Sequence, residues 1–148
     1  MPRKPDALVS VSSRQKAVRV PRKRIAELVP FVAEAEGVVL AEVDVAVVSA
    51  EEIATLNRRY LRHAGPTDVL SFDLSRPGDR GLVAQLVVCG DVAVTEAAAR
   101  GLRPQQELML YVIHGLLHVM GYDDRRPPDA ARMHAREEHV LGAFLASR

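Results

Sequence analysis

The stretch PQQELMLYVIHGLLHVMG, residues 104 to 121, decides the fold of this chain. It begins with proline, which suits the first turn of a helix because the N–H that proline lacks would have no partner there. It ends with glycine, which readily adopts the left-handed conformation that terminates helices. The residues between them are compatible with a helix and mostly apolar. We therefore predict a long buried helix over residues 104–120.

Strand patterns gather in the earlier part of the chain and helix patterns toward its end. Ser49, with Glu52 three residues later, forms a capping box that starts a helix. Pro30 can kink or divide an earlier helix. Strands are predicted over residues 7–12, 43–49, 66–74 and 82–92, and the other helices over residues 21–37, 49–62, 93–100 and 128–146. This order predicts an α+β fold in which helices pack on a small mixed sheet.

The composition indicates one globular domain spanning residues 1–148. A chain of 148 residues with 48% hydrophobic content can bury about two thirds of its unfolded surface. Cys89 is the only cysteine, which excludes an internal disulfide and suits a reduced, cytoplasmic protein. The longest apolar segment has about 14 residues, whereas a membrane span needs about 20. We therefore expect no membrane contact, and the basic start leads into no apolar stretch typical of a signal peptide.

Charge is uneven along the chain although the net charge is only +1. The first 24 residues contain many Arg and Lys residues and a single acidic residue, Asp6. Such a cluster either forms a solvated face or attracts polyanions such as nucleic acid. The cluster alone does not decide between these two interpretations.

Two histidines on the long helix, His114 and His118, raise the question of a metal site. Positions i and i+4 share one helix face, so both imidazoles can reach one cation, although two hydrogen-bonded core histidines fit equally well. Gly121 can end the helix and turn the chain back, which lets a third donor approach. Three protein ligands plus water form a catalytic zinc site. A zincin protease would need Glu after the first histidine, where this chain has Gly115.

Three segments, at residues 114–124, 56–72 and 90–91, together resemble the YbeY family of bacterial endoribonucleases. HGLLHVMGYDD (114 to 124) matches the family signature H-G-x-L-H-x-x-G-Y-D-H at all but its last residue. LNRRYLRHAGPTDVLSF (56 to 72) resembles the family's L-N-x-x-Y-R-x-x-D-x-P-T-D-V-L-S-F, and Gly90-Asp91 resembles its G-D-I. The resemblance covers roughly residues 43 to 142. It implies a metal-dependent hydrolase specific for single-stranded RNA, with a zincin-like metal-site helix.

The resemblance also implies partners, a cofactor and ligands. The partners are single-stranded RNA, rRNA and the small ribosomal subunit, with roles in 16S rRNA 3′-end maturation and ribosome quality control and with no DNA. The family's three histidine ligands map to His114, His118 and Asp124. Aspartate can bind zinc, but its added charge makes bound water less acidic and favours Mn²⁺ as a competitor. In a rival interpretation Asp124 caps the last helix, and His134 or His139 is the third ligand.

The chain departs from the family at a second place, before the PTD segment. Leu61 and Ala64 stand where the family has Arg and Asp, and the arginine is suspected to hold the scissile phosphate. Arg62 or Arg59 could substitute because a guanidinium offers a bidentate fork to phosphate. Further candidates are His63 and Ser71 for substrate contact and Asp91 for catalysis. We expect Asp91, in the strand 82–92, to orient a metal-bound histidine or to cap the following helix.

Two other functions fit the same residues. The main competitor is a non-catalytic, ribosome-associated RNA-binding factor in which the metal mainly holds the last helices together. A zinc hydrolase of small molecules or peptides is a weaker alternative, because Gly115 supplies no general base.

Overall fold

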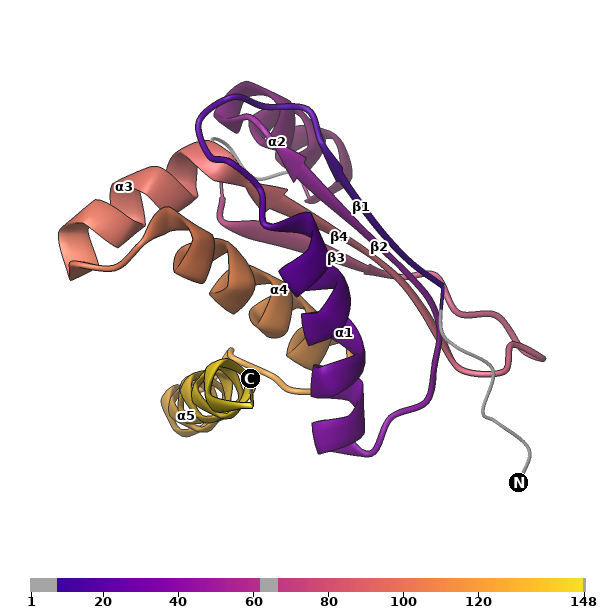
Figure 1. Ribbon diagram of the computed structural model, residues 1–148. Helices are drawn as coiled ribbons and strands as arrows, with labels where there is room; N and C mark the ends of the chain where they lie inside the picture. Colours follow the sequence, from indigo (N-terminus) through magenta and orange to yellow (C-terminus); the bar gives the residue numbers. More distant parts are fainter. Residues whose placement is uncertain (1–7, 62–66, 148) are drawn as a thin grey trace.

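The computed structural model describes residues 8–61 and 67–147, and only the backbone of Leu61 (Figure 1). The strands in these residues are β1 (Leu8–Ser13), β2 (Leu40–Val48), β3 (Val69–Asp73) and β4 (Leu82–Cys89). The helices are α1 (Arg22–Glu36), α2 (Ala50–Leu56), the π-helical η1 (Asn57–Leu61), α3 (Gly90–Arg100), α4 (Pro104–Val119) and α5 (Pro127–Ala146). None of the helices in these two ranges has the length and apolar content needed to cross a membrane.

The strands form one mixed sheet in the order β1-β2-β4-β3. β2 pairs in parallel with β1 on one side and with β4 on the other, and β3 pairs antiparallel with β4. Val45 of β2 lies opposite Val11 on one neighbour and Leu86 on the other. A mixed sheet with helices packed on it confirms the predicted α+β class.

Alternate residues of the central strands belong to two separate apolar clusters. Val45 and Leu86 face the main core with α1, α4 and α5, whereas Ala46 and Val87 join a smaller cluster with Ile53 of α2. This two-residue period follows from the pleat of a strand, which points successive side chains to opposite faces. Helices α1 and α4 therefore share one face of the sheet (Figure 1), and α5 packs outside them.

Helix α4 confirms the prediction for residues 104–120 within one residue. Pro104 occupies its first position, and Gly121 follows it with a φ of 110°, a conformation that favours glycine. Gly115 is buried against the sheet: a Cβ at this position would lie 2.9 Å from Leu86 Cδ2 and 3.0 Å from Ser71 Oγ. The glycine therefore lets α4 approach β3 and β4 closely.

Some predicted boundaries are wrong. The strand predicted over residues 82–92 ends at Cys89, and α3 begins at Gly90 instead of residue 93, so Asp91 lies in a helix. The helix predicted from 49 to about 62 starts as expected, with Ser49 Oγ accepting a hydrogen bond from the backbone N–H of Glu52. It changes to a π-helical turn at Asn57. Helix α1 continues through Pro30 without being divided.

Candidate functional site

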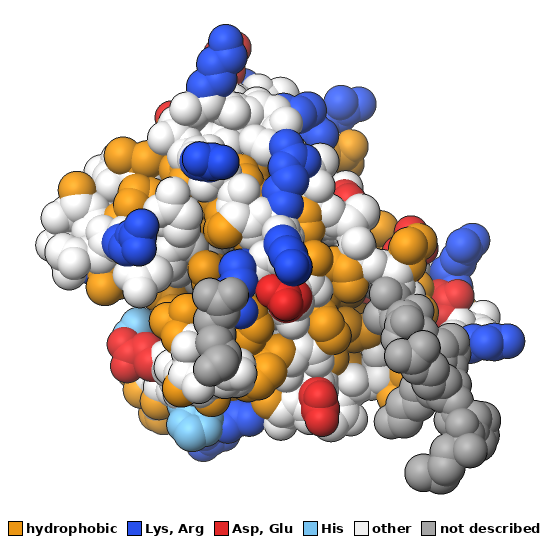
Figure 2. All heavy atoms as spheres, in the orientation of Figure 1, with side chains coloured by type: hydrophobic (Ala, Val, Ile, Leu, Met, Phe, Trp, Pro, Cys, Tyr) orange, Lys and Arg blue, Asp and Glu red, His pale blue; other side chains and the backbone are white. Residues whose placement is uncertain are grey.

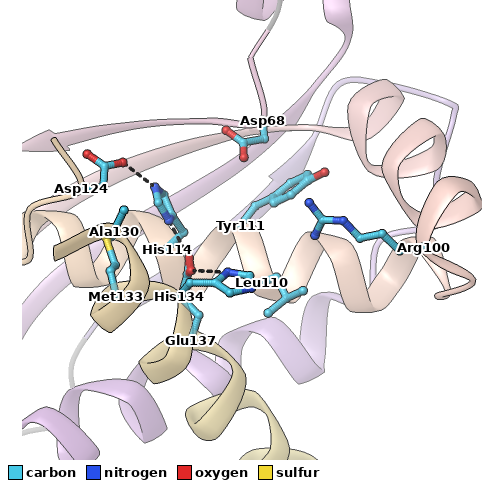
Figure 3. A pocket seen from close by; sticks show the side chains of 10 residues that line it. All are labelled: Asp68, Arg100, Leu110, Tyr111, His114, Asp124, Ala130, Met133, His134 and Glu137. Carbon is cyan, nitrogen blue, oxygen red and sulfur yellow. Dashed lines mark hydrogen bonds and ion pairs between the residues drawn. The ribbon is translucent and has the colours of Figure 1, made fainter. Parts of the chain in front are cut away.

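A cavity of about 340 Å³ opens between α4, α5 and the start of β3 (Figure 3). Segments far apart in the sequence meet there, because α5 packs across α4 beside the sheet. The charged and histidine side chains that line the cavity are Asp68, Arg100, His114, Asp124, His134 and Glu137. It therefore collects two of the three predicted metal ligands, His114 and Asp124.

The closest contact in this cavity joins His114 to Glu137. Nδ1 of His114 lies 2.6 Å from Oε1 of Glu137, whose side chain is only 10% exposed. The hydrogen bond to Glu137 raises the pKa of His114, against the opposing effect of burial. When the neutral imidazole donates Nδ1–H to Glu137, the lone pair of Nε2 is available to a ligand.

Sequence reasoning missed Glu137. The signal was its place on α5, where Met133, Glu137, Val140 and Phe144 form the buried face at helical spacing. A carboxylate on such a face needs a buried partner. That partner is His114, on a helix that the sequence alone does not place opposite α5.

Asp124 approaches the other nitrogen of His114. Its Oδ2 lies 3.8 Å from Nε2, at the distal side of the ring from Glu137 (Figure 3). The turn that carries it folds back on α4, with the backbone N–H of Tyr122 donating to the carbonyl of Leu117 at 3.0 Å. The backbone N–H of Arg125 donates to Oδ1 of Asp123 at 3.0 Å, so the side chain of Asp123 supports this turn. The predicted return of the chain at Gly121 is therefore confirmed.

The arrangement of the predicted ligand atoms fits a divalent cation in part. Two ligands at the usual distance from a tetrahedral zinc ion lie about 3.4 Å apart, close to the 3.8 Å between His114 Nε2 and Asp124 Oδ2. His118 is exposed and lies outside the cavity lining. In residues 8–61 and 67–147, no group of three or more His, Cys, Asp or Glu side chains is arranged to hold a metal ion. The structure thus brings two predicted ligands together and leaves the third one helical turn away.

The two alternative third ligands differ in position. His134 lines the cavity, 3.8 Å from Glu137 and with Nε2 3.2 Å from Oε1 of Glu138. His139 is exposed on α5 and does not line the cavity. On position alone, His134 is the stronger of these two alternatives to Asp124.

Three further predicted site residues, Arg59, Ser71 and Asp91, lie away from the cavity lining. Arg59 is exposed in η1, with its guanidinium 5.7 Å from the ring centre of Tyr60. Ser71 faces α4 at Gly115, next to His114 in the chain. Arg62 and His63 lie outside the described residues.

Asp91 has a different partner from either of those expected. Its Oδ2 accepts a hydrogen bond from the backbone N–H of Ala50 at 2.6 Å, at the first residue of α2. Asp91 itself lies in the first turn of α3. Its carboxylate therefore supports the start of α2, whereas the sequence predicted a contact with a histidine or with the start of the following helix.

Part of the basic N-terminal cluster is neutralised by neighbouring acids. Arg14 pairs with Glu52 at 2.6 Å, and Arg24 lies 3.7 Å from Glu27 and 4.1 Å from the ring centre of Phe144. On the face seen in Figure 2, Lys and Arg side chains lie mainly over the upper part and the right side, and some lie beside the histidine side chains at the lower left.

Comparisons with known proteins agree with these features. A family model described as Endoribonuclease YbeY matches residues 10–145. A protein of that name from Nocardioides sp. is 36% identical over 133 residues, covering 84% of this chain and 89% of the relative. Another from Thermobifida fusca is 33% identical over 144 residues, covering 91% and 93%.

A solved structure supports the fold. The solution structure of TM1509 from Thermotoga maritima is similar with a TM-score of 0.63 and 25% sequence identity, over 94% of this chain and 90% of that one. The family model spans nearly the whole described chain, and the histidine pair and its turn lie within the match. The chain belongs to the YbeY endoribonuclease family.

Proposed function

We propose that this protein is a metal-dependent endoribonuclease that cleaves single-stranded RNA, acting in 16S rRNA 3′-end maturation and ribosome quality control on the small ribosomal subunit. One observation carries the proposal: in a member of this family, His114 is held by buried Glu137 and presents Nε2 toward Asp124 in an open cavity. A histidine fixed through one nitrogen by a carboxylate is the usual arrangement of a metal ligand.

In this proposal His114, His118 and Asp124 hold one divalent ion, Zn²⁺ or alternatively Mn²⁺. The ion would supply Lewis-acid stabilisation of phosphoryl oxygen and a more acidic water. Glu137 keeps the His114 ring in the tautomer that leaves Nε2 free, and it fixes the orientation of that ring. Asp124 adds a negative charge where the family signature has histidine, so we expect Mn²⁺ to compete better than at a three-histidine site.

The site does not suit a peptidase of the zincin type. Position 115 faces β3 and β4, where even a Cβ would come within 3.0 Å of neighbouring atoms. A glutamate there could not serve the cavity as a general base. The geometry around Gly115 therefore argues against peptide hydrolysis by the zincin mechanism.

A second candidate is a non-catalytic RNA-binding factor on the ribosome. Leu61 stands where the family signature has arginine, and Arg59 lies away from the cavity. In that case the metal and the contact between His114 and Glu137 would serve to join α4 to α5.

The deciding experiment incubates metal-loaded protein with a labelled single-stranded RNA and with the same sequence in a duplex. We expect cleavage of the single strand, and at least a hundredfold loss for His114→Ala. Gln105→Ala, on the same helix but outside the cavity lining, is the matched control and should cleave normally. Equal cleavage by the wild type and His114→Ala would indicate a contaminating nuclease and overturn the proposal. Binding of RNA without cleavage would support the second candidate.

A further inference from the structure

Arg100 brings a cation into an otherwise acidic cavity. It is the last residue of α3, and its side chain is 50% exposed at the cavity lining. Among the described residues that line this cavity it is the one Lys or Arg. Figure 3 shows its guanidinium beside Tyr111, at the opposite side of the cavity from Asp124.

A buried carboxylate fixes this guanidinium. Glu107 of α4 is fully buried, and its Oε1 lies 3.2 Å from Nη1 of Arg100. Glu96, on the exposed side, lies 3.7 Å from Nη2. A guanidinium has five N–H donors, so these contacts leave donors for a further group. Because Glu107 is buried, Arg100 is held in place before any ligand binds.

The position of Arg100 relative to His114 suggests what it binds. Glu107 and His114 are seven residues apart on α4, which corresponds to two turns and about 10 Å along the helix axis. A ligand group bound by Arg100 would therefore lie some distance from a ligand group bound near His114, but in the same cavity. This displacement suits a neighbouring nucleotide of one extended strand.

We infer that Arg100 binds a backbone phosphate of the RNA strand, adjacent to the phosphate that is cleaved, and that Glu107 is its positioning residue. This inference rests on the proposed function. Asp68, Asp124 and Glu137 would repel an anion elsewhere in the cavity. A phosphate that does not contact the metal ion is therefore best accommodated at the end of the cavity where Arg100 lies. Guanidinium groups bind phosphate by paired, charge-assisted hydrogen bonds.

Binding of a fluorescent single-stranded RNA by metal-free protein, measured over a range of salt concentrations, tests this role. Arg100→Met alone would leave Glu107 as an unpaired buried charge, so the variant of choice combines Arg100→Met with Glu107→Gln. We expect binding about tenfold weaker and a salt slope reduced by about 0.7, the value for one phosphate contact on a single strand. Arg80→Met, in the exposed loop before β4, should stay within about twofold of the wild type. Glu107→Gln alone removes the charge that positions Arg100, so it should weaken binding, but less than the double variant does.

A second measurement needs no variant. Phenylglyoxal modifies exposed arginines, and mass spectrometry should show that single-stranded RNA protects Arg100 but not Arg80. The inference about Arg100 would be overturned if the double variant had the same RNA affinity and salt slope as Glu107→Gln, or if RNA did not protect Arg100 from phenylglyoxal. Neither outcome would affect the proposed function. Failure of the wild type to bind or cleave single-stranded RNA would overturn the proposed function as well.

Discussion

Nδ1 of His114 and Oε1 of Glu137 lie 2.6 Å apart and join the centre of α4 to the buried face of α5. The same contact belongs to the core, since Glu137 lies between Met133 and Val140 on that face. It also orients the imidazole whose Nε2 faces Asp124. One hydrogen bond therefore contributes both to the stability of the helix pair and to the geometry of the candidate site.

This contact predicts a pH dependence for the metal-free protein. The hydrogen bond to Glu137 raises the pKa of His114 above its ordinary value of 6.5. The protonated imidazole therefore stabilises the folded state fully below about pH 6.5, and this contribution is lost as the pH rises through the raised pKa. Glu137→Gln should lower the pKa of His114 and remove this part of the pH dependence.

Proton NMR titration of the His114 ring, assigned with His114→Ala, measures this pKa directly. Urea unfolding at several pH values gives the matching free energies. The difference in unfolding free energy between the wild type and Glu137→Gln should shrink as the pH is raised above 6.5. A His114 pKa that is the same in both proteins would refute this account.

Metal content separates the ligand assignments. Removing a residue that hydrogen-bonds to a metal ligand lowers metal affinity by about 10–100-fold, so removing the ligand itself should lower it by at least as much. We expect such losses for His114→Ala, His118→Ala and Asp124→Ala, measured by metal titration and elemental analysis. Asp124→His should favour Zn²⁺ over Mn²⁺ relative to the wild type.

The matched controls are His134→Ala and His139→Ala on α5. Both should keep their metal, because the described geometry brings Asp124 rather than either of them to Nε2 of His114. Metal retained by Asp124→Ala but lost by His134→Ala would show that the third ligand comes from α5.

Two glycines give a test of how closely α4 packs on the sheet. A methyl group at Gly115 would lie 2.9 Å from Leu86 Cδ2 and 3.2 Å from Val69 Cγ2, so Gly115→Ala should destabilise the protein by about 1–3 kcal/mol. A methyl group at Gly142, exposed in the interior of α5, would point into open space, with no neighbouring side chain within 4 Å. Gly142→Ala should stabilise by about 0.5–1 kcal/mol, since alanine favours helices. Chemical denaturation measures both, and a neutral Gly115→Ala would contradict the close approach.

The elements that the sequence predicts well are those with local signals. Pro104 and Gly121 mark the ends of α4, and Ser49 marks the start of α2. The end of β4 is missed because the apolar run continues through Gly90 into the buried side of α3, and periodicity cannot separate a short apolar strand from the start of a buried helix. The π-helical turn at Asn57 has no sequence signal of its own.

The candidate site is predictable only as far as its residues are close in the sequence. His114 and Asp124 belong to one motif, and the structure brings them together. Glu137 and Arg100 come from other helices, and their roles depend on how α5 and α3 pack against α4. That packing is set by the whole core, so neither residue can be assigned to the cavity from sequence spacing.

The turn that carries Asp124 is anchored to α1 by Tyr122. Its hydroxyl donates to Oε1 of Glu36 at 2.6 Å, and Nε of Arg136 donates to the other carboxylate oxygen at 2.8 Å. The Glu36 side chain is only 7% exposed. These contacts join the motif turn, the end of α1 and α5 around one carboxylate.

Tyr122→Phe removes one hydrogen bond to this charged group and should cost about 1.5–3 kcal/mol of stability. Because the turn then loses its anchor, metal affinity should fall as well, while the His114 pKa in metal-free protein stays unchanged. Tyr60→Phe is the matched control: Tyr60 is 57% exposed, so its unfolding free energy should change by less than about 0.5 kcal/mol. Urea unfolding and metal titration of both variants measure these effects. If Tyr122→Phe lost stability but bound metal as tightly as the wild type, the anchor would serve the fold without positioning Asp124.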